Sequence, residues 1–231
     1  MTFTGRTSLV VLLLASHAAT QAVKTAYPSM APISRYLMPR DAEISLARSA
    51  APKSVSDAAE ILVFTKTGFQ TAVKGTNGFV CMVARSWSAA WDDPDFWDPR
   101  VRAPNCYNAA AAESQVALTN KRTQIALAGG SRAQMLDAIK AAVDRGSLPV
   151  PKAGSMSYML SKDTYLSDRD GHWLPHLMFY LAGTDPKAWG AGVPDSPIMG
   201  LRHPEEHSTT FLVPVIKWSD RTLATSKRHS K

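Results

Sequence analysis

Histidine is the residue type whose spacing in this 231-residue chain best suits metal chemistry. Four of the six histidines fall in two short clusters, His172–His176 and His203–His207. Two imidazoles four residues apart lie on one face of a helix, where they can bind one metal ion. Pro175 disfavours a helix in the first cluster, so one ligand from each cluster, with Glu206 or Asp170, is the expected geometry for a divalent metal. The candidate metal ligands are His172, His176, His203 and His207.

The second cluster also matches the His-x-x-Glu-His pattern of the inverzincin metallopeptidases. Such a site needs a further carboxylate ligand downstream, whereas after His207 the chain contains no glutamate and only Asp220. A metal-dependent hydrolase that uses the paired histidine clusters is therefore kept as the alternative function. The competing interpretation is that these histidines cap turns and pack beside Trp173.

Tryptophans give the leading hypothesis, because five of the six lie in predicted loops. Loops on a rigid sheet are where binding residues concentrate, and an indole offers a broad face to a sugar, a peptide or an aromatic ligand. We therefore expect a pocket for a small molecule or a cell-envelope component. The alternative is that the indoles close the ends of the core. The candidate binding residues are Trp87, Trp91, Trp97, Trp173 and Trp189.

The segment Gly129–Ala133 approaches the Gly-x-Ser-x-Gly nucleophile elbow, but its last residue is alanine and a helical pattern precedes it. Ser131, with Gln134 three residues later, instead predicts a capping box at the start of a helix. The chain contains no Ser-x-x-Lys, Walker-type or Cys-x-x-Cys motif. The sequence does not name a reaction.

The first residues have the pattern of a secretory signal. Arg6 precedes the apolar run 9–15, and small residues follow as far as Ala22. This run is too short to span a bilayer, and no later run is long enough, so we expect no transmembrane segment in the mature chain. Cleavage after Ala22 and export to the periplasm or the extracellular space are expected.

Charge and cysteine content agree with an exported protein. The formal charge is +7, but the only dense group of basic residues is the tail 227–231, which argues against a nucleic-acid partner. Cys81 and Cys106 are the only cysteines, and an even number in an oxidising compartment predicts one disulfide. Two buried free thiols are the alternative.

Hydrophobic periodicity predicts an α+β domain with a mainly antiparallel sheet of about six strands and a central helical hairpin. Asn77-Gly78 lies between two β-branched runs, so the first three strands are expected to form an antiparallel meander. Asn108 is expected to cap a helix over 109–128, and Ser131 a second helix that ends before Gly146. The predicted strands cover residues 61–65, 69–73, 79–84, 155–160, 176–181 and 209–215.

One folded domain is expected over residues 40–219. The signal peptide, residues 1–22, precedes an extended leader, residues 23–39, that contains three prolines. Residues 220–231 are expected to form a basic, flexible tail.

Four stretches of the mature chain stand out together: Gly78–Trp87, Phe96–Pro99, Tyr158–Lys162 and His172–Phe179. They resemble segments of a group of uncharacterised bacterial exported proteins. The resemblance implies export and brings no activity or ligand with it.

Overall fold

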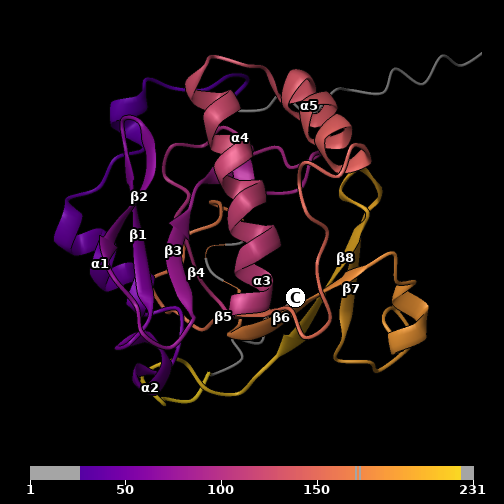
Figure 1. Cartoon of the computed structure of the whole chain (residues 1–231). Helices are drawn as coiled ribbons and strands as arrows, with labels where there is room; N and C mark the ends of the chain where they lie inside the picture. The colour runs from indigo at the N-terminus through magenta and orange to yellow at the C-terminus, as the bar shows by residue number, and fades with distance from the viewer. Residues whose placement is uncertain (1–26, 170, 172, 225–231) are drawn as a thin grey trace, which may run out of the picture.

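The computed structural model describes residues 27–169, 171 and 173–224 (Figure 1). Their backbone forms one eight-stranded sheet in the order β2-β1-β3-β4-β5-β6-β8-β7. The strands are β1 (Glu60–Thr65), β2 (Gly68–Val73), β3 (Val80–Ala84), β4 (Ala103–Tyr107), β5 (Met156–Met159), β6 (His176–Ala182), β7 (Met199–His203) and β8 (Ser208–Pro214). The α+β class is confirmed, but the sheet has eight strands where about six were expected.

Helical segments cover both faces of this sheet. The α-helices are α1 (Arg40–Arg48), α2 (Lys53–Ser56), α3 (Ala109–Ala111), α4 (Ala117–Leu127) and α5 (Arg132–Asp144). A π-helical turn, η3 (Ala112–Val116), joins α3 to α4. The short 3-10 helices are η1 (Ile33–Arg35), η2 (Ser86–Ser88), η4 (Pro186–Trp189) and η5 (Pro204–Glu206).

The predicted meander of β1, β2 and β3 is wrong in its pairing. β1 and β2 form an antiparallel hairpin, but β3 lies on the other side of β1 and runs parallel to it. The segment after β2 passes the start of β1: Thr76 N donates to Ala58 O, and Glu60 N donates to Phe79 O, each at 2.8 Å. Asn77 donates to Val55 O at 2.7 Å, so its turn packs against α2 and joins no paired strands.

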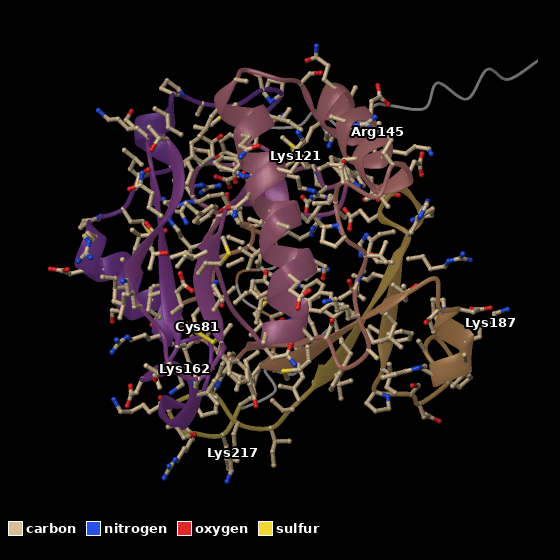
Figure 2. The ribbon with its side chains drawn as sticks, in the orientation of Figure 1. Cys81, Lys121, Arg145, Lys162, Lys187 and Lys217 are labelled. Carbon is tan, nitrogen blue, oxygen red and sulfur yellow. A yellow bond between two sulfur atoms is a disulfide. The ribbon has the colours of Figure 1, made fainter. Side chains whose placement is uncertain are left out.

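Alternate residues of the central strands face different helices. Ile61 packs in a cluster with Ala47 of α1, whereas Leu62 packs in a cluster with Ala111 of α3. Cys81 of β3 lies opposite Cys106 of β4, and the two form a disulfide in the cluster under α1 (Figure 2). The predicted disulfide is confirmed. Ala47 on α1, with Ala50 and Ala51 just after it, lets the chain lie close to the sheet at that point.

The predicted helical hairpin is confirmed, with both of its caps. Asn108 Oδ1 accepts a hydrogen bond from Ala111 N at 2.9 Å. Ser131 Oγ accepts from Gln134 N at 3.2 Å, and Gln134 Oε1 accepts from Ser131 N at 2.8 Å, which completes the capping box. Both helical arms of the hairpin therefore begin where the sequence placed their capping residues.

The segment expected to be an extended leader belongs to the folded domain from Tyr27 onward. Tyr36 is 0 % exposed and packs in the core cluster beside Trp87, at 4.9 Å between ring centroids. Its hydroxyl donates to Trp97 O at 2.8 Å, and its carbonyl accepts from Arg85 Nε at 2.9 Å. We therefore move the start of the folded domain from residue 40 to Tyr27, because the buried ring of Tyr36 holds this segment against the core. The signal peptide and residues 225–231 of the predicted tail lie outside the described residues.

Candidate functional site

The described residues form a cleft of about 490 Å³ between three segments. We call it the α5 cleft, because its rim includes the first turn of α5. The other two segments are the N-terminal residues 27–30 and the loop that carries Phe96 and Trp97. In Figure 1 the indigo N-terminal segment runs beside the turn between α4 and α5, where the cleft lies.

Aromatic rings form one wall of the α5 cleft. Phe96 and Trp97 meet edge to face, with ring centroids 4.9 Å apart, and both side chains are largely buried. Tyr27 and Met30 pack against the same core cluster. The Trp97 carbonyl accepts the Tyr36 hydroxyl hydrogen bond, and this hydroxyl also accepts from Ala31 N at 3.1 Å. The N-terminal segment and the aromatic wall are thus fixed to each other.

The opposite rim is the turn between α4 and α5. Gly129 has φ +78°, and a Cβ on Gly130 would lie 2.6 Å from Ile125 Cγ2, so this tight turn depends on glycine. It directs the start of α5 at the cleft. Ser131 is occupied in the capping box, which agrees with the capping interpretation and leaves the nucleophile-elbow pattern without its strand.

Arg132 supplies the charge of the α5 cleft. It is the one ionisable side chain of Asp, Glu, Lys, Arg or His type among the described residues that line the cleft. Its guanidinium lies 5.4 Å from the Phe96 ring centroid, and its Nη1 donates to Asp93 O at 3.0 Å. No other hydrogen bond of this side chain is found within the described part of the chain. Its remaining N–H groups can therefore reach a ligand.

Of the five predicted tryptophans, the cleft uses Trp97. Trp87 lies in the core, and its Nε1 donates to Thr123 Oγ1 at 3.0 Å. Trp91 stacks on Phe96, with Arg122 3.8 Å from the centroid of its indole. These two indoles close the core, as the alternative interpretation had it.

The remaining two predicted tryptophans lie elsewhere. Trp173 is 39 % exposed and contacts His176, with ring centroids 5.9 Å apart. Trp189 is 38 % exposed and stacks on Phe211 at 4.5 Å. The structure therefore does not gather the five indoles into one pocket.

Among the described histidines, His176 lies far from the second cluster. β6 and β8 are antiparallel, with His176 opposite Pro214 and Ala182 opposite Ser208. Six residues of strand separate His176 from the end of β8 that follows His207, a span of about 20 Å. Because a histidine nitrogen must lie about 2 Å from its metal, one ion cannot bind His176 together with His203 or His207. A site that combines these histidines is corrected on this ground; His172 and Asp170 lie outside the described residues.

The structure brings a different set of metal-ligating residues together. His203, Glu205 and Glu206 each offer a ligand atom, and these atoms lie within 4.8 Å of one another. His207 turns away from them, and its Nε2 lies 3.1 Å from Asp144 Oδ1. Glu206 forms a buried ion pair with Arg122.

Sequence reasoning missed Tyr27, Met30, Phe96 and Arg132 as candidate site residues. Tyr27 and Met30 fell in the expected leader, and Arg132 followed a capping serine with no motif of its own. Phe96 stood beside Trp97, which was the one usable signal.

No protein family, no curated protein and no solved structure matches the chain. Among the described residues, no helix is both long enough and apolar enough to cross a membrane.

Proposed function

We propose that the chain is an exported protein that binds a small amphipathic anion in the α5 cleft. The flat apolar part of the ligand lies against Tyr27, Met30 and Pro94, which the buried rings of Phe96 and Trp97 support, and its anionic group faces Arg132. The observation that carries the proposal is that one cleft of about 490 Å³ combines an aromatic wall with a single cation. Small-molecule sites in proteins have volumes of about 300–1,000 Å³ and the same mixture of apolar walls with few polar groups.

The aromatic wall favours a planar ligand. The edge-to-face contact and the burial of both rings hold Phe96 and Trp97 in place, so they form a rigid support beneath the cleft. Met30 also lines the cleft and packs against this cluster, and methionine adapts to the shape of an apolar partner. An aromatic or fused-ring group fits this combination better than a flexible aliphatic chain.

The rim favours a negative group. Arg132 carries the charge, and its partial burial, its position over the Phe96 ring and its hydrogen bond to Asp93 O limit its motion. The amides of Arg132 and Ala133 begin a 13-residue helix and have no hydrogen-bond acceptor among the described residues. The positive end of the helix dipole adds to the attraction of the guanidinium. A carboxylate or a sulfonate suits this rim.

Export is supported by the signal pattern of residues 1–22 and by the disulfide between Cys81 and Cys106. Export and the cleft together favour a periplasmic or extracellular binding protein, or an accessory protein of the cell envelope.

A fluorescence titration with 1-anilinonaphthalene-8-sulfonate tests the proposal, because this probe joins a fused aromatic ring to a sulfonate. One bound probe per chain is expected, with about tenfold weaker binding in Arg132→Gln, which corresponds to about 1.4 kcal/mol. Arg145→Gln is the matched control, since Arg145 is the C-cap residue at the other end of α5 and lies outside the cleft (Figure 2).

Competition distinguishes the charge requirement from simple hydrophobicity. Indole-3-acetate is expected to displace the probe, whereas tryptamine, which has the same ring and a cationic tail, is not. Equal displacement by both compounds, or equal affinity of Arg132→Gln and the unmodified protein for the probe, would contradict the assignment of the ligand to this cleft.

A further inference from the structure

We infer that the turn between β7 and β8 is a binding site for one divalent transition-metal ion, with Zn²⁺ as the expected occupant. The ligands are His203, Glu205 and Glu206, which we call the η5 triad because they begin and form η5. One ligand atom from each residue lies within 4.8 Å of the others. Ligand atoms about 2 Å from one tetrahedral ion lie about 3.3 Å apart, so small side-chain rotations bring these three atoms onto one ion.

The triad differs from a group of exposed acidic residues in its burial. Glu206 is 8 % exposed, and His203 and Glu205 are half-buried. A carboxylate that is removed from water needs a cationic or hydrogen-bonding partner for its oxygens. Arg122 bonds Glu206 Oε1, and no hydrogen bond from the described residues reaches Oε2. Oε2 of this carboxylate is thus accessible and has no hydrogen-bond donor among the described residues, and it lies beside an imidazole and a second carboxylate.

Arg122 fixes Glu206 in position for a metal. Its Nη1 donates to Trp87 O at 3.1 Å and to Ala89 O at 2.8 Å, so η2 and the residue after it hold the guanidinium in place. Its Nη2 then holds Glu206. An outer partner of this kind orients a metal-binding carboxylate before the ion arrives.

The local charge also favours a divalent cation. Glu205 and Glu206 contribute two negative charges, and Arg122 contributes one positive charge. The triad and Arg122 together therefore have a net charge of −1 when the imidazole is neutral. A divalent ion reverses this excess, whereas a monovalent ion would have weaker attraction and no preference for an imidazole nitrogen.

The ligand types select the class of metal. An imidazole suits Zn²⁺ and its neighbours in the transition series, whereas Mg²⁺ and Ca²⁺ prefer sets made of oxygen alone. Two carboxylates keep Mn²⁺ as the second choice. Three protein ligands leave a coordination position for water or another molecule, as in open zinc sites.

His207 gives the inference its matched control. It follows the triad directly, but its left-handed backbone, φ 49°, turns it toward α5, where its Nε2 contacts Asp144. His207 is therefore a histidine of the same turn that takes no part in the triad. His207→Ala should leave metal binding intact, in contrast to the earlier expectation from sequence that both histidines of this cluster are candidate ligands.

Calorimetric titration of the metal-depleted protein with ZnCl₂, MnCl₂ and MgCl₂ tests the site. One Zn²⁺ per chain is expected, with weaker Mn²⁺ binding and no Mg²⁺ binding. His203→Ala and Glu205→Gln should each weaken Zn²⁺ binding at least tenfold, and His207→Ala less than twofold. Glu205→Gln preserves the shape of the side chain and is the variant of choice if His203→Ala does not fold.

The absorption spectrum of the Co²⁺-loaded protein identifies the ligand atoms without any activity measurement. The visible bands of Co²⁺ should change in His203→Ala and stay the same in His207→Ala. Zn²⁺ affinity that neither triad variant lowers, or that His207→Ala lowers as much as they do, would overturn the assignment.

Discussion

The Arg85 guanidinium lies 2.8 Å from the Glu43 carboxylate, and both side chains are almost completely buried. Glu43 belongs to α1, and the same carboxylate oxygen accepts a hydrogen bond from Phe64 N at 3.0 Å. Arg85 follows β3 and also donates to the carbonyl of Tyr36. This one ion pair therefore joins the N-terminal segment, the first helix and two neighbouring strands. Burial lowers the pKa of Arg85 to about 10, which still leaves it charged at pH 7.

Glu43→Gln is expected to lower the free energy of unfolding by about 3–5 kcal/mol, because it leaves a buried guanidinium without its counter-charge. Urea unfolding followed by tryptophan fluorescence measures the loss. Asp41→Asn is the control on the same helix: Asp41 is exposed, and its removal should change stability by less than about 0.5 kcal/mol. A loss below about 1 kcal/mol in Glu43→Gln would mean that the pair contributes little.

Removal of the disulfide by the double substitution Cys81→Ala, Cys106→Ala is expected to lower the free energy of unfolding by roughly 3 kcal/mol, since the bridge closes a loop of 25 residues. The same unfolding measurement applies, with and without a reducing agent. Thiol titration of the denatured, unreduced protein should find no free thiol. Two free thiols in exported material would contradict the bridge.

Acid is expected to destabilise the fold through His176. Burial holds the pKa of this imidazole below its ordinary value of 6.5, while its Nδ1 lies 2.8 Å from Leu174 O. As the pH falls below 6.5, the unfolded chain binds a proton that the folded chain resists, so the free energy of unfolding falls by up to about 1.4 kcal/mol per pH unit. Unfolding free energies at pH 7.5 and pH 5.5 measure this loss.

The variant His176→Gln should lose less stability between these two pH values than the unmodified protein. An identical pH dependence in both proteins would show that other groups cause the acid sensitivity.

Export predicts the first residue of the mature chain. Cleavage after Ala22 should yield a protein that begins near Val23, and the intact mass of exported material measures it. Recovery of a chain that still carries Arg6 would contradict both the signal and the expected oxidising compartment.

Local signals predicted the helical hairpin, because a cap acts within a few residues. Asn108 and Ser131 each bond a backbone amide three residues ahead, and the sequence alone shows that spacing. Strand partners are a different problem. The sequence correctly predicted a turn at Asn77-Gly78. The position of β3 beside β1, however, depends on contacts of this turn with the distant residue Val55.

The two strands that were missed have weak local patterns for physical reasons. β4 contains Pro104, which has no N–H to donate. On the side of β4 that faces away from β3, Arg102 pairs with Tyr165 and Cys106 pairs with Tyr158. Pro104 lies between these two pairings and is paired with neither partner on that side. β7 is an edge strand with a glycine, Gly200, that packs under Pro186. Neither strand alternates apolar and polar residues.

The cleft was partly visible in the sequence. Trp97 was a candidate from its residue type alone. Met30 and Arg132 lie far from it along the chain. Met30 reaches the cleft because the N-terminal segment packs against the core, and Arg132 reaches it because the start of α5 lies beside Phe96. The η5 triad was half visible, since His203 and Glu206 were both named as candidate ligands while their true neighbour, Glu205, was not.

The order of strands in the sheet affects the rate of folding, because several strand pairs join distant segments of the chain. β1 pairs with β3 across the intervening strand β2, and β4 pairs with β5 across the whole helical hairpin, from Tyr107 to Met156. Pairings between distant segments slow folding, because the intervening chain must be closed into a loop first. The topology suits the proposed export, because the sheet lacks β6, β7 and β8 until the C-terminal part of the chain has emerged.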